Sequence, residues 1–294
     1  MRNRLTYGPI MLLGLLGLLW LDWRLELWTA EPGQRGIAGL GLLAVLLVML
    51  PPAVMELARL FAAEQIRPYR FIAAAGSGSL VVHAFLTQFP RFRAVSASTL
   101  AFIIVFVMLF AALRRAWRKQ TQEAIVRMAG TVLATLYLGG LAWFLMALRV
   151  KQSETGGFRG STMIIVMILL VVKFTDIGAY FGGRKLGRHK LIPWLSPGKT
   201  WEGLACGLLT AGAVAVLCAR WIEPLVWWKA LIFGIVIGGI GQVGDLLESL
   251  MKRDAEVKDS GSLIPGFGGV LDIIDSSLLA APFAYLLFSL FRGV

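Results

Sequence analysis

The chain has 294 residues, of which 57% are hydrophobic and only 16% are charged. This balance excludes an ordinary soluble globular protein and indicates a polytopic membrane protein. The formal net charge of +12 does not indicate nucleic acid as a partner, because the basic residues are spread over the links between apolar segments. Membrane lipids with anionic headgroups are the expected partners of such links.

The apolar segments predict the architecture. A helix needs about 20 apolar residues to cross a bilayer core of about 30 Å. We therefore predict an all-α, polytopic integral membrane protein with about nine transmembrane helices. Their expected ranges are 8–22, 36–56, 71–89, 97–113, 128–148, 162–183, 202–219, 228–250 and 271–291.

The distribution of Lys and Arg predicts the orientation in the membrane. With a cytoplasmic N-terminus, 18 of the 29 basic residues fall on the cytoplasmic side. Because cytoplasmic links carry an excess of Lys and Arg, this bias favours a cytoplasmic N-terminus and an external C-terminus. The links after the sixth and eighth spans then share the cytoplasmic face, where nucleotides are available.

The first five spans differ in character from the last four. They consist mostly of Leu, Ala, Val and Phe, and their interiors carry no acidic residue. We interpret residues 1–151 as a transmembrane scaffold. The polar, glycine-bearing segment 152–160 is the expected boundary, and residues 152–294 are the expected catalytic half with its cytoplasmic substrate loops.

The sixth span carries two charged residues at membrane depth. Lys173 and Asp176 are three residues apart, so they share one face of a helix. One interpretation is an internal ion pair that allows both charges to be buried. The other is that Asp176 faces a polar cavity together with acidic residues of the last two spans.

A basic link precedes the seventh span. Ser196, Lys199 and Thr200 supply two hydroxyls and an ammonium next to a helix start, which suits phosphate binding. The segment is not a Walker loop, because Pro193 stands where the required first glycine of that motif would be.

Four carboxylates mark the ends of the last two spans. Asp245 and Glu248 close the eighth span, and Asp272 and Asp275 open the ninth. Acidic side chains at membrane depth cost about 2.5–3.5 kcal/mol each, and they usually have a function. Because carboxylates at close range repel one another unless a cation lies between them, we predict a metal site.

The link between these spans supplies the opposite charge. Lys252, Arg253 and Lys258 suit a phosphate-rich ligand. Gly268 and Gly269 allow backbone amides to approach an anion where the ninth span begins. Acids, bases and an amide-rich turn together indicate metal-assisted phosphate chemistry.

This stretch resembles the signature of the phosphatidate cytidylyltransferases, the CDP-diacylglycerol synthases. Phe267 stands where that family has His, and Ile273 where it has Arg. The positions in register are Ser249, Lys252, Arg253, Lys258, Asp259, Gly261, Pro265, Gly268, Gly269, Asp272 and Asp275.

A second segment of the same family is also matched, with Gly198 in place of a Lys. Together the two segments cover about residues 160–294. The matching residues of the second segment are Asp176, Gly178, Ala179, Tyr180, Phe181, Ser196, Pro197, Lys199, Thr200, Trp201, Glu202 and Gly203.

The resemblance implies a metal-dependent nucleotidyltransferase of phospholipid biosynthesis that converts CTP and phosphatidate into CDP-diacylglycerol and pyrophosphate. It also implies a homodimer in the bacterial inner membrane, with the active site on the cytoplasmic side. The expected cofactor is Mg²⁺ in a two-metal site, and the identity of the second ion is left open, a monovalent cation included. Expected metal ligands and catalytic residues are Asp245, Asp272 and Asp275, with Lys252 as a further catalytic residue. Expected substrate-binding residues are Ser196, Lys199, Thr200, Ser249, Arg253, Lys258, Gly268 and Gly269, and secondary candidates are Asp176, Glu248 and Asp259.

Three alternatives remain at this stage. Phe267 and Ile273 leave open a catalytically silent homologue. A cation-coupled transporter would need acids near the bilayer midplane and matching halves, whereas the acids here cluster in one half. A third alternative is another enzyme that joins nucleotides to lipids.

Overall fold

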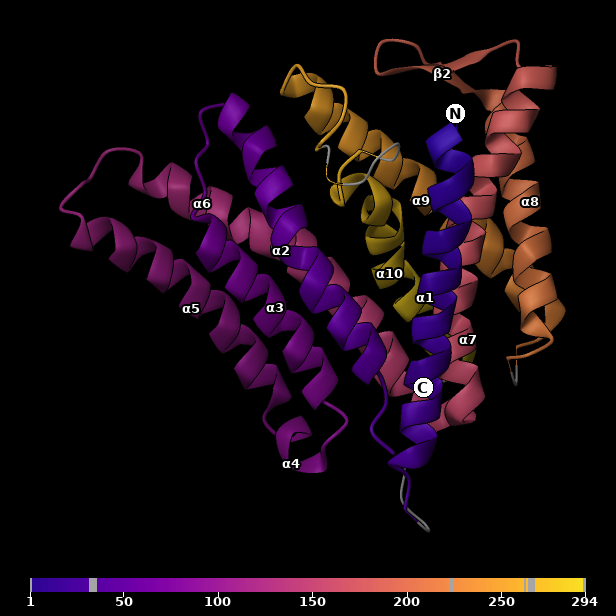
Figure 1. Cartoon of the computed structure of the whole chain (residues 1–294), viewed down its shortest axis with the longest axis horizontal. Coiled ribbons are helices and arrows are strands. Elements are labelled where there is room, and N and C mark those ends of the chain that lie inside the picture. Colours follow the sequence, from indigo (N-terminus) through magenta and orange to yellow (C-terminus); the bar gives the residue numbers. More distant parts are fainter. Residues whose placement is uncertain (1, 32–35, 223–224, 262, 264–267, 293–294) are drawn as a thin grey trace. The chain divides into compact units, whose positions relative to one another are not determined.

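The computed structural model describes residues 2–31, 36–222, 225–261, 263 and 268–292, without the side chains of 2–9, 11, 12, 152–160 and 292 (Figure 1). The described chain is mostly helical. Its helices are α1 (Arg2–Trp28), α2 (Leu40–Ala63), α3 (Arg70–Leu86), α4 (Pro90–Arg93), α5 (Ser96–Trp117), α6 (Ala124–Ala134), the π-helix η1 (Thr135–Gly140), α7 (Leu141–Leu186), α8 (Trp201–Ala219), α9 (Trp227–Asp254) and α10 (Leu271–Arg292).

The all-α membrane architecture predicted from the sequence is confirmed. Among the described residues, seven helical segments are long and apolar enough to cross a membrane. They coincide with seven of the nine predicted spans, while the total of nine stays a prediction. The seven segments are Leu40–Ala63, Ser96–Trp117, Ala124–Lys151, Ser161–Leu186, Trp201–Ala219, Trp227–Asp254 and Leu271–Phe291.

The two remaining predicted spans differ from these seven. The third corresponds to α3, an apolar helix of only 17 residues. The first falls within α1, where several side chains lie outside the described residues. Segment 152–160, predicted to be a polar link, lies within the continuous helix α7. The division into scaffold and catalytic halves therefore stays a prediction.

The link before α8 is not a simple loop. Strands β1 (Lys190–Ile192) and β2 (Ser196–Thr200) form an antiparallel hairpin in which Lys190 pairs with Thr200. The sequence reasoning missed this hairpin because each strand is short and β2 contains Pro197 and Gly198, which are depleted in strands.

The chain divides into two compact units. The first contains Met1–Val150 and Met251–Ile273, and the second contains Lys151–Leu250 and Ile274–Val294. In the first unit α3 packs between α2 and α5, and α1 packs against α2 (Figure 1). The signature link after α9 thus belongs to the same unit as α2.

Small residues allow the helices of the second unit to approach closely. A Cβ atom at Gly182 would collide with Cys206 of α8, and one at Gly234 would lie 2.7 Å from Cβ of Ala215. Close approach of this kind is how helices pack where lipid surrounds them. It fixes α7, α8 and α9 side by side and so positions their polar residues.

Candidate metal and phosphate site

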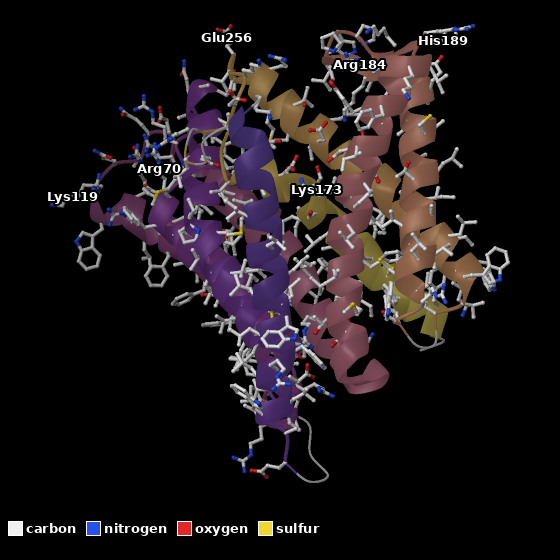
Figure 2. The ribbon with its side chains drawn as sticks, turned by 45° about the vertical axis from the view of Figure 1, so that its right-hand side comes forward. Arg70, Lys119, Lys173, Arg184, His189 and Glu256 are labelled. Atoms are coloured by element: carbon white, nitrogen blue, oxygen red, sulfur yellow. The ribbon has the colours of Figure 1, made fainter. Side chains whose placement is uncertain are left out.

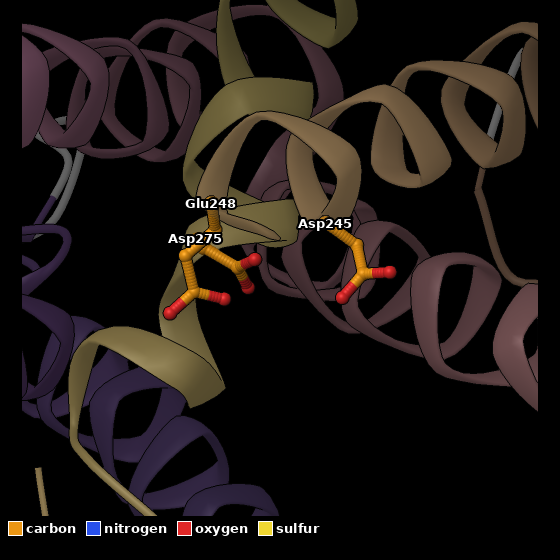
Figure 3. Close-up of side chains that lie close together, drawn as sticks. All are labelled: Asp245, Glu248 and Asp275. Atoms are coloured by element: carbon orange, nitrogen blue, oxygen red, sulfur yellow. The ribbon is translucent and has the colours of Figure 1, made fainter. Parts of the chain in front are cut away.

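Three carboxylates meet in the second unit. Ligand atoms of Asp245, Glu248 and Asp275 all lie within 4.8 Å of one another. Figure 3 shows Glu248 of α9 beside Asp275 of α10, with Asp245 one helical turn earlier on α9. The sequence reasoning placed two of these residues among the metal ligands and Glu248 among the secondary candidates.

Local sequence explains why the three side chains meet. Asp245 and Glu248 are three residues apart and therefore share one face of α9. Gly244 allows α10 to come close, because a Cβ there would lie 3.0 Å from Cα of Ser276. Asp275 precedes Ser276, so the close approach of the two helices carries its carboxylate to Glu248.

The cluster has the properties of a cation site. Glu248 and Asp275 are only 1% and 3% exposed. The hydroxyl of Ser276 donates to Oδ1 of Asp275 at 3.1 Å, while Oδ2 has no hydrogen-bond donor in the described part of the chain. Buried carboxylates held this close repel one another, and a shared divalent cation removes that repulsion.

The hairpin places the ammonium group of Lys199 at the edge of the cluster. Nζ of Lys199 lies 2.5 Å from Oδ2 of Asp245 and 3.5 Å from the carbonyl oxygen of Gln242. Asp245 is the most accessible of the three carboxylates, with 41% of its side chain exposed. Lys199 thus joins the predicted phosphate-binding segment to the predicted metal site.

Asp176 is linked to helix α9 by the side-chain amide of Gln242, a residue that sequence reasoning missed. Nε2 of Gln242 donates to Oδ1 of Asp176 at 2.7 Å, and Gln242 is 6% exposed. Gln242 lies three residues before Asp245, on the same face of α9. A single amide inside an apolar helix was the available signal.

Figure 2 shows Lys173 part-way along α7, with Arg184 near the end of that helix and His189 directly before the hairpin. Lys173 and Arg184 are exposed. The ion pair between Lys173 and Asp176 stays a prediction, while the hydrogen bond from Gln242 gives Asp176 a defined partner.

The predicted hydroxyls of the hairpin have different environments. Thr200 is the N-cap of α8, and its Oγ1 accepts a hydrogen bond from the amide of Gly203 at 3.1 Å. Its hydroxyl hydrogen is still able to reach a second acceptor. Ser196 begins β2 and is half-buried.

The first unit holds the signature turn. Nζ of Lys252 lies 2.9 Å from Oδ1 of Asp272, and the amide of Gly269 donates to Oδ2 of Asp272 at 2.7 Å. Gly268 has a φ of +95°, and a Cβ there would collide with the Asp272 carboxylate. Only glycine combines this backbone conformation with so close an approach.

Asp272 and Asp275 are three residues apart in the first turns of α10, but they belong to different compact units. The assignment of Asp272 as a metal ligand therefore stays a prediction. In the described structure its carboxylate binds an ammonium and a backbone amide.

The other predicted residues are more accessible. Ser249 is half-buried, whereas Arg253, Lys258 and Asp259 are exposed, as expected of groups that meet a substrate from solution. Pro265, Gly266 and Phe267 lie outside the described residues.

Glu56 was missed completely by the sequence reasoning. It lies in α2, is 2% exposed, and accepts hydrogen bonds from the backbone where α10 begins. The second predicted span ends at residue 56, whereas α2 continues to Ala63, so the prediction that the interiors of the first five spans carry no acidic residue is wrong at Glu56.

A sequence profile of the cytidylyltransferase family matches residues 35–291. The chain belongs to the cytidylyltransferase family. The match extends over both units and includes α2, so the resemblance is not confined to the signature turn.

Individual relatives agree with this family. The chain is 39% identical over 160 residues to a phosphatidate cytidylyltransferase of Bacillus subtilis, covering 54% of this chain and 57% of the relative. It is 41% identical over 143 residues to a phosphatidate cytidylyltransferase of Haemophilus influenzae, covering 47% and 49%. It is 38% identical over 153 residues to the uncharacterized protein YnbB of Escherichia coli, covering 52% and 49%. The matches span about half the length of these relatives.

Proposed function

We propose that the protein is a phosphatidate cytidylyltransferase, which converts CTP and phosphatidate into CDP-diacylglycerol and pyrophosphate. The observation that carries this proposal is the acidic cluster with Lys199 beside it, in a membrane chain of the cytidylyltransferase family. The names of the relatives from Bacillus subtilis and Haemophilus influenzae support the same substrates.

The reaction suits the residues that the site contains. A phosphate oxygen of phosphatidate attacks the α-phosphorus of CTP, the bond from that phosphorus to the β-phosphate oxygen breaks, and pyrophosphate leaves. The nucleophile is already an anion, so no strong general base is required. This agrees with a chain that has only two His residues.

The carboxylates fit a divalent cation, and we assign Asp245, Glu248 and Asp275 as its ligands, with Asp272 as a further candidate. Two of the three clustered carboxylates are buried, and oxygen donors are the ligands that Mg²⁺ prefers. Bound Mg²⁺ would screen the approach of the two anionic substrates and neutralise charge on the pyrophosphate. A second ion, divalent or monovalent, is compatible with this set.

The basic and hydroxyl groups bind the phosphates of the two substrates. Lys199 and Lys252 present ammonium groups that are already paired with carboxylates, so they are oriented before substrate binds. Backbone amides of the glycine turn suit phosphate oxygens at the start of α10. The remaining proposed contacts to substrate are Ser196, Thr200, Ser249, Arg253, Lys258, Gly268 and Gly269.

We also propose a bacterial inner-membrane location with the site facing the cytoplasm. The bias of Lys and Arg supports this orientation, and the relatives named above are bacterial. A homodimer is proposed from the family resemblance alone.

Lipid mass spectrometry tests the proposed reaction. The detergent-purified protein, given phosphatidate, CTP and Mg²⁺, should form CDP-diacylglycerol. Absence of product from folded, lipid-supplemented protein would contradict the proposal. Cation flux into proteoliposomes would then separate a transporter from a silent homologue.

A further inference from the structure

Glu56 places a carboxylate against the signature turn from a distant part of the sequence. Its Oε2 accepts a hydrogen bond from the amide of Leu271 at 2.8 Å, and its Oε1 accepts one from the amide of Val270 at 3.1 Å. The hydroxyl of Ser260 lies 3.4 Å from Oε2. All of these residues belong to the first compact unit.

Burial of the Glu56 carboxylate costs free energy unless hydrogen-bond donors satisfy it. Glu56 is 2% exposed in a helix long and apolar enough to cross a membrane. A buried carboxylate is tolerated when hydrogen-bond donors satisfy it. Leu271 is the first residue of α10, where amides lack partners within the helix and the helix dipole favours a negative charge.

Two glycines of the signature make room for this carboxylate. A Cβ added at Gly261 would collide with the Glu56 side chain, and its three nearest atoms all belong to that side chain. A Cβ at Gly269 would collide with both Glu56 and Ser260. Glu56 thus gives a physical reason for small residues at both positions.

The turn that Glu56 holds also contacts Asp272 and Lys252, two residues proposed to act on the substrate. Next to the amides held by Glu56, the amide of Gly269 donates to Asp272, and Asp272 pairs with Lys252. Both oxygens of Glu56 face backbone amides, so its own role is to hold the backbone.

We propose that Glu56 is a positioning residue, which caps α10 from α2 and so fixes the turn that orients Asp272 and Lys252. The proposal deepens the cytidylyltransferase function proposed above and rests on it for the effect on catalysis. The contacts themselves are tested independently of activity.

The first test is Glu56→Gln, with Glu64→Gln as the matched control. Glutamine has nearly the same shape, but its NH₂ group replaces one acceptor and faces a backbone donor. Glu64 is an exposed residue just beyond the end of the same helix. We expect kcat of Glu56→Gln to fall by about 10- to 100-fold, as expected when reacting groups are displaced by about 1 Å. Glu64→Gln should keep the wild-type kcat, and Glu56→Asp should recover part of the loss.

Hydrogen exchange gives a readout that does not depend on turnover. In Glu56→Gln, the amides of Val270 and Leu271 should exchange faster than in wild type, while a peptide from α5 in the same unit should be unchanged. Equal exchange in wild type and variant would overturn the proposal, and so would faster exchange spread evenly over the unit. If wild type itself forms no product, the cytidylyltransferase proposal fails, yet this measurement still decides the role of Glu56.

A double-mutant cycle tests the contact between Glu56 and Gly261 without relying on Glu56→Gln alone. Gly261→Ala should lower kcat in the wild-type background by pushing the Glu56 carboxylate away from the turn. In a Glu56→Ala background the same change should have little further effect, because the colliding atoms are gone. Additive losses in the two backgrounds would contradict the proposal.

Discussion

The ammonium nitrogen of Lys199 lies 2.5 Å from a carboxylate oxygen of Asp245. This pair connects strand β2 with helix α9 and joins a proposed phosphate-binding group to a proposed metal ligand. In the proposed site, CTP and Mg²⁺ would replace part of the contact between Lys199 and Asp245 with contacts of their own.

Lys199→Met is therefore expected to weaken the use of CTP. A hydrogen bond to a charged group contributes about 1.5–3 kcal/mol, so kcat/KM for CTP should fall by about 10- to 100-fold. The control is Lys190→Met, since the Lys190 side chain is exposed and its ammonium group donates to the carbonyl oxygen of Pro197. Equal losses in both variants, measured by CTP titration, would show that Lys199 has no special role.

Glu248→Gln is expected to weaken the affinity for Mg²⁺, because it removes one of two buried carboxylates of the cluster. The Mg²⁺ concentration for half-maximal activity should rise by about 10- to 100-fold, by analogy with loss of a group that supports a metal site. The Mg²⁺-dependent rise in melting temperature should shrink in parallel. Glu256→Gln, at an exposed position, should change neither measurement. An unchanged Mg²⁺ titration in Glu248→Gln would remove Glu248 from the site.

Asp272→Asn is expected to abolish turnover while the protein remains folded. The change removes the charge that pairs with Lys252 and a proposed metal ligand, and loss of one preorganised group at a reacting centre commonly costs about 100-fold or more. Circular dichroism and gel filtration check the fold, and product formation checks the activity. Turnover at the wild-type rate would remove Asp272 from the catalytic assignment.

Gln242→Leu is expected to destabilise the second unit. Asp176 would lose its hydrogen bond from Nε2 of Gln242; a buried polar group left without its partner costs about 1–3 kcal/mol, and a charged group costs more. Adding Asp176→Asn should recover part of the stability, because a neutral amide is less costly to bury. Thermal unfolding in detergent measures both changes, and a second substitution that lowers stability further would contradict the inferred contact.

Local patterns in the sequence predicted much of the fold and part of the site. Apolar segments of bilayer length predicted nine spans, and seven of these coincide with described helices that are long and apolar enough to cross a membrane. The prediction works because a chain within a bilayer must satisfy its own backbone hydrogen bonds, which a helix does. The spacing of Asp245 and Glu248 predicted a shared helix face. The end of one span and the start of the next predicted that Asp275 would lie near them.

Contacts between segments far apart in the sequence could not be predicted from residue spacing. Glu56 lies at the edge of a predicted span, and its donors follow 204 to 215 residues later, so no periodicity connects them. The signature predicted the importance of Gly261 and Gly269, but the Glu56 carboxylate that fills the space beside them became visible only in the fold.

The most direct test of the central claim is release of pyrophosphate by the detergent-purified protein. Wild type should release it only when phosphatidate, CTP and Mg²⁺ are all present. Asp275→Asn, which changes a buried carboxylate of the acidic cluster, should release little or none while remaining folded. Release by Asp275→Asn at the wild-type rate, or no release by folded wild type, would contradict the proposed cytidylyltransferase site.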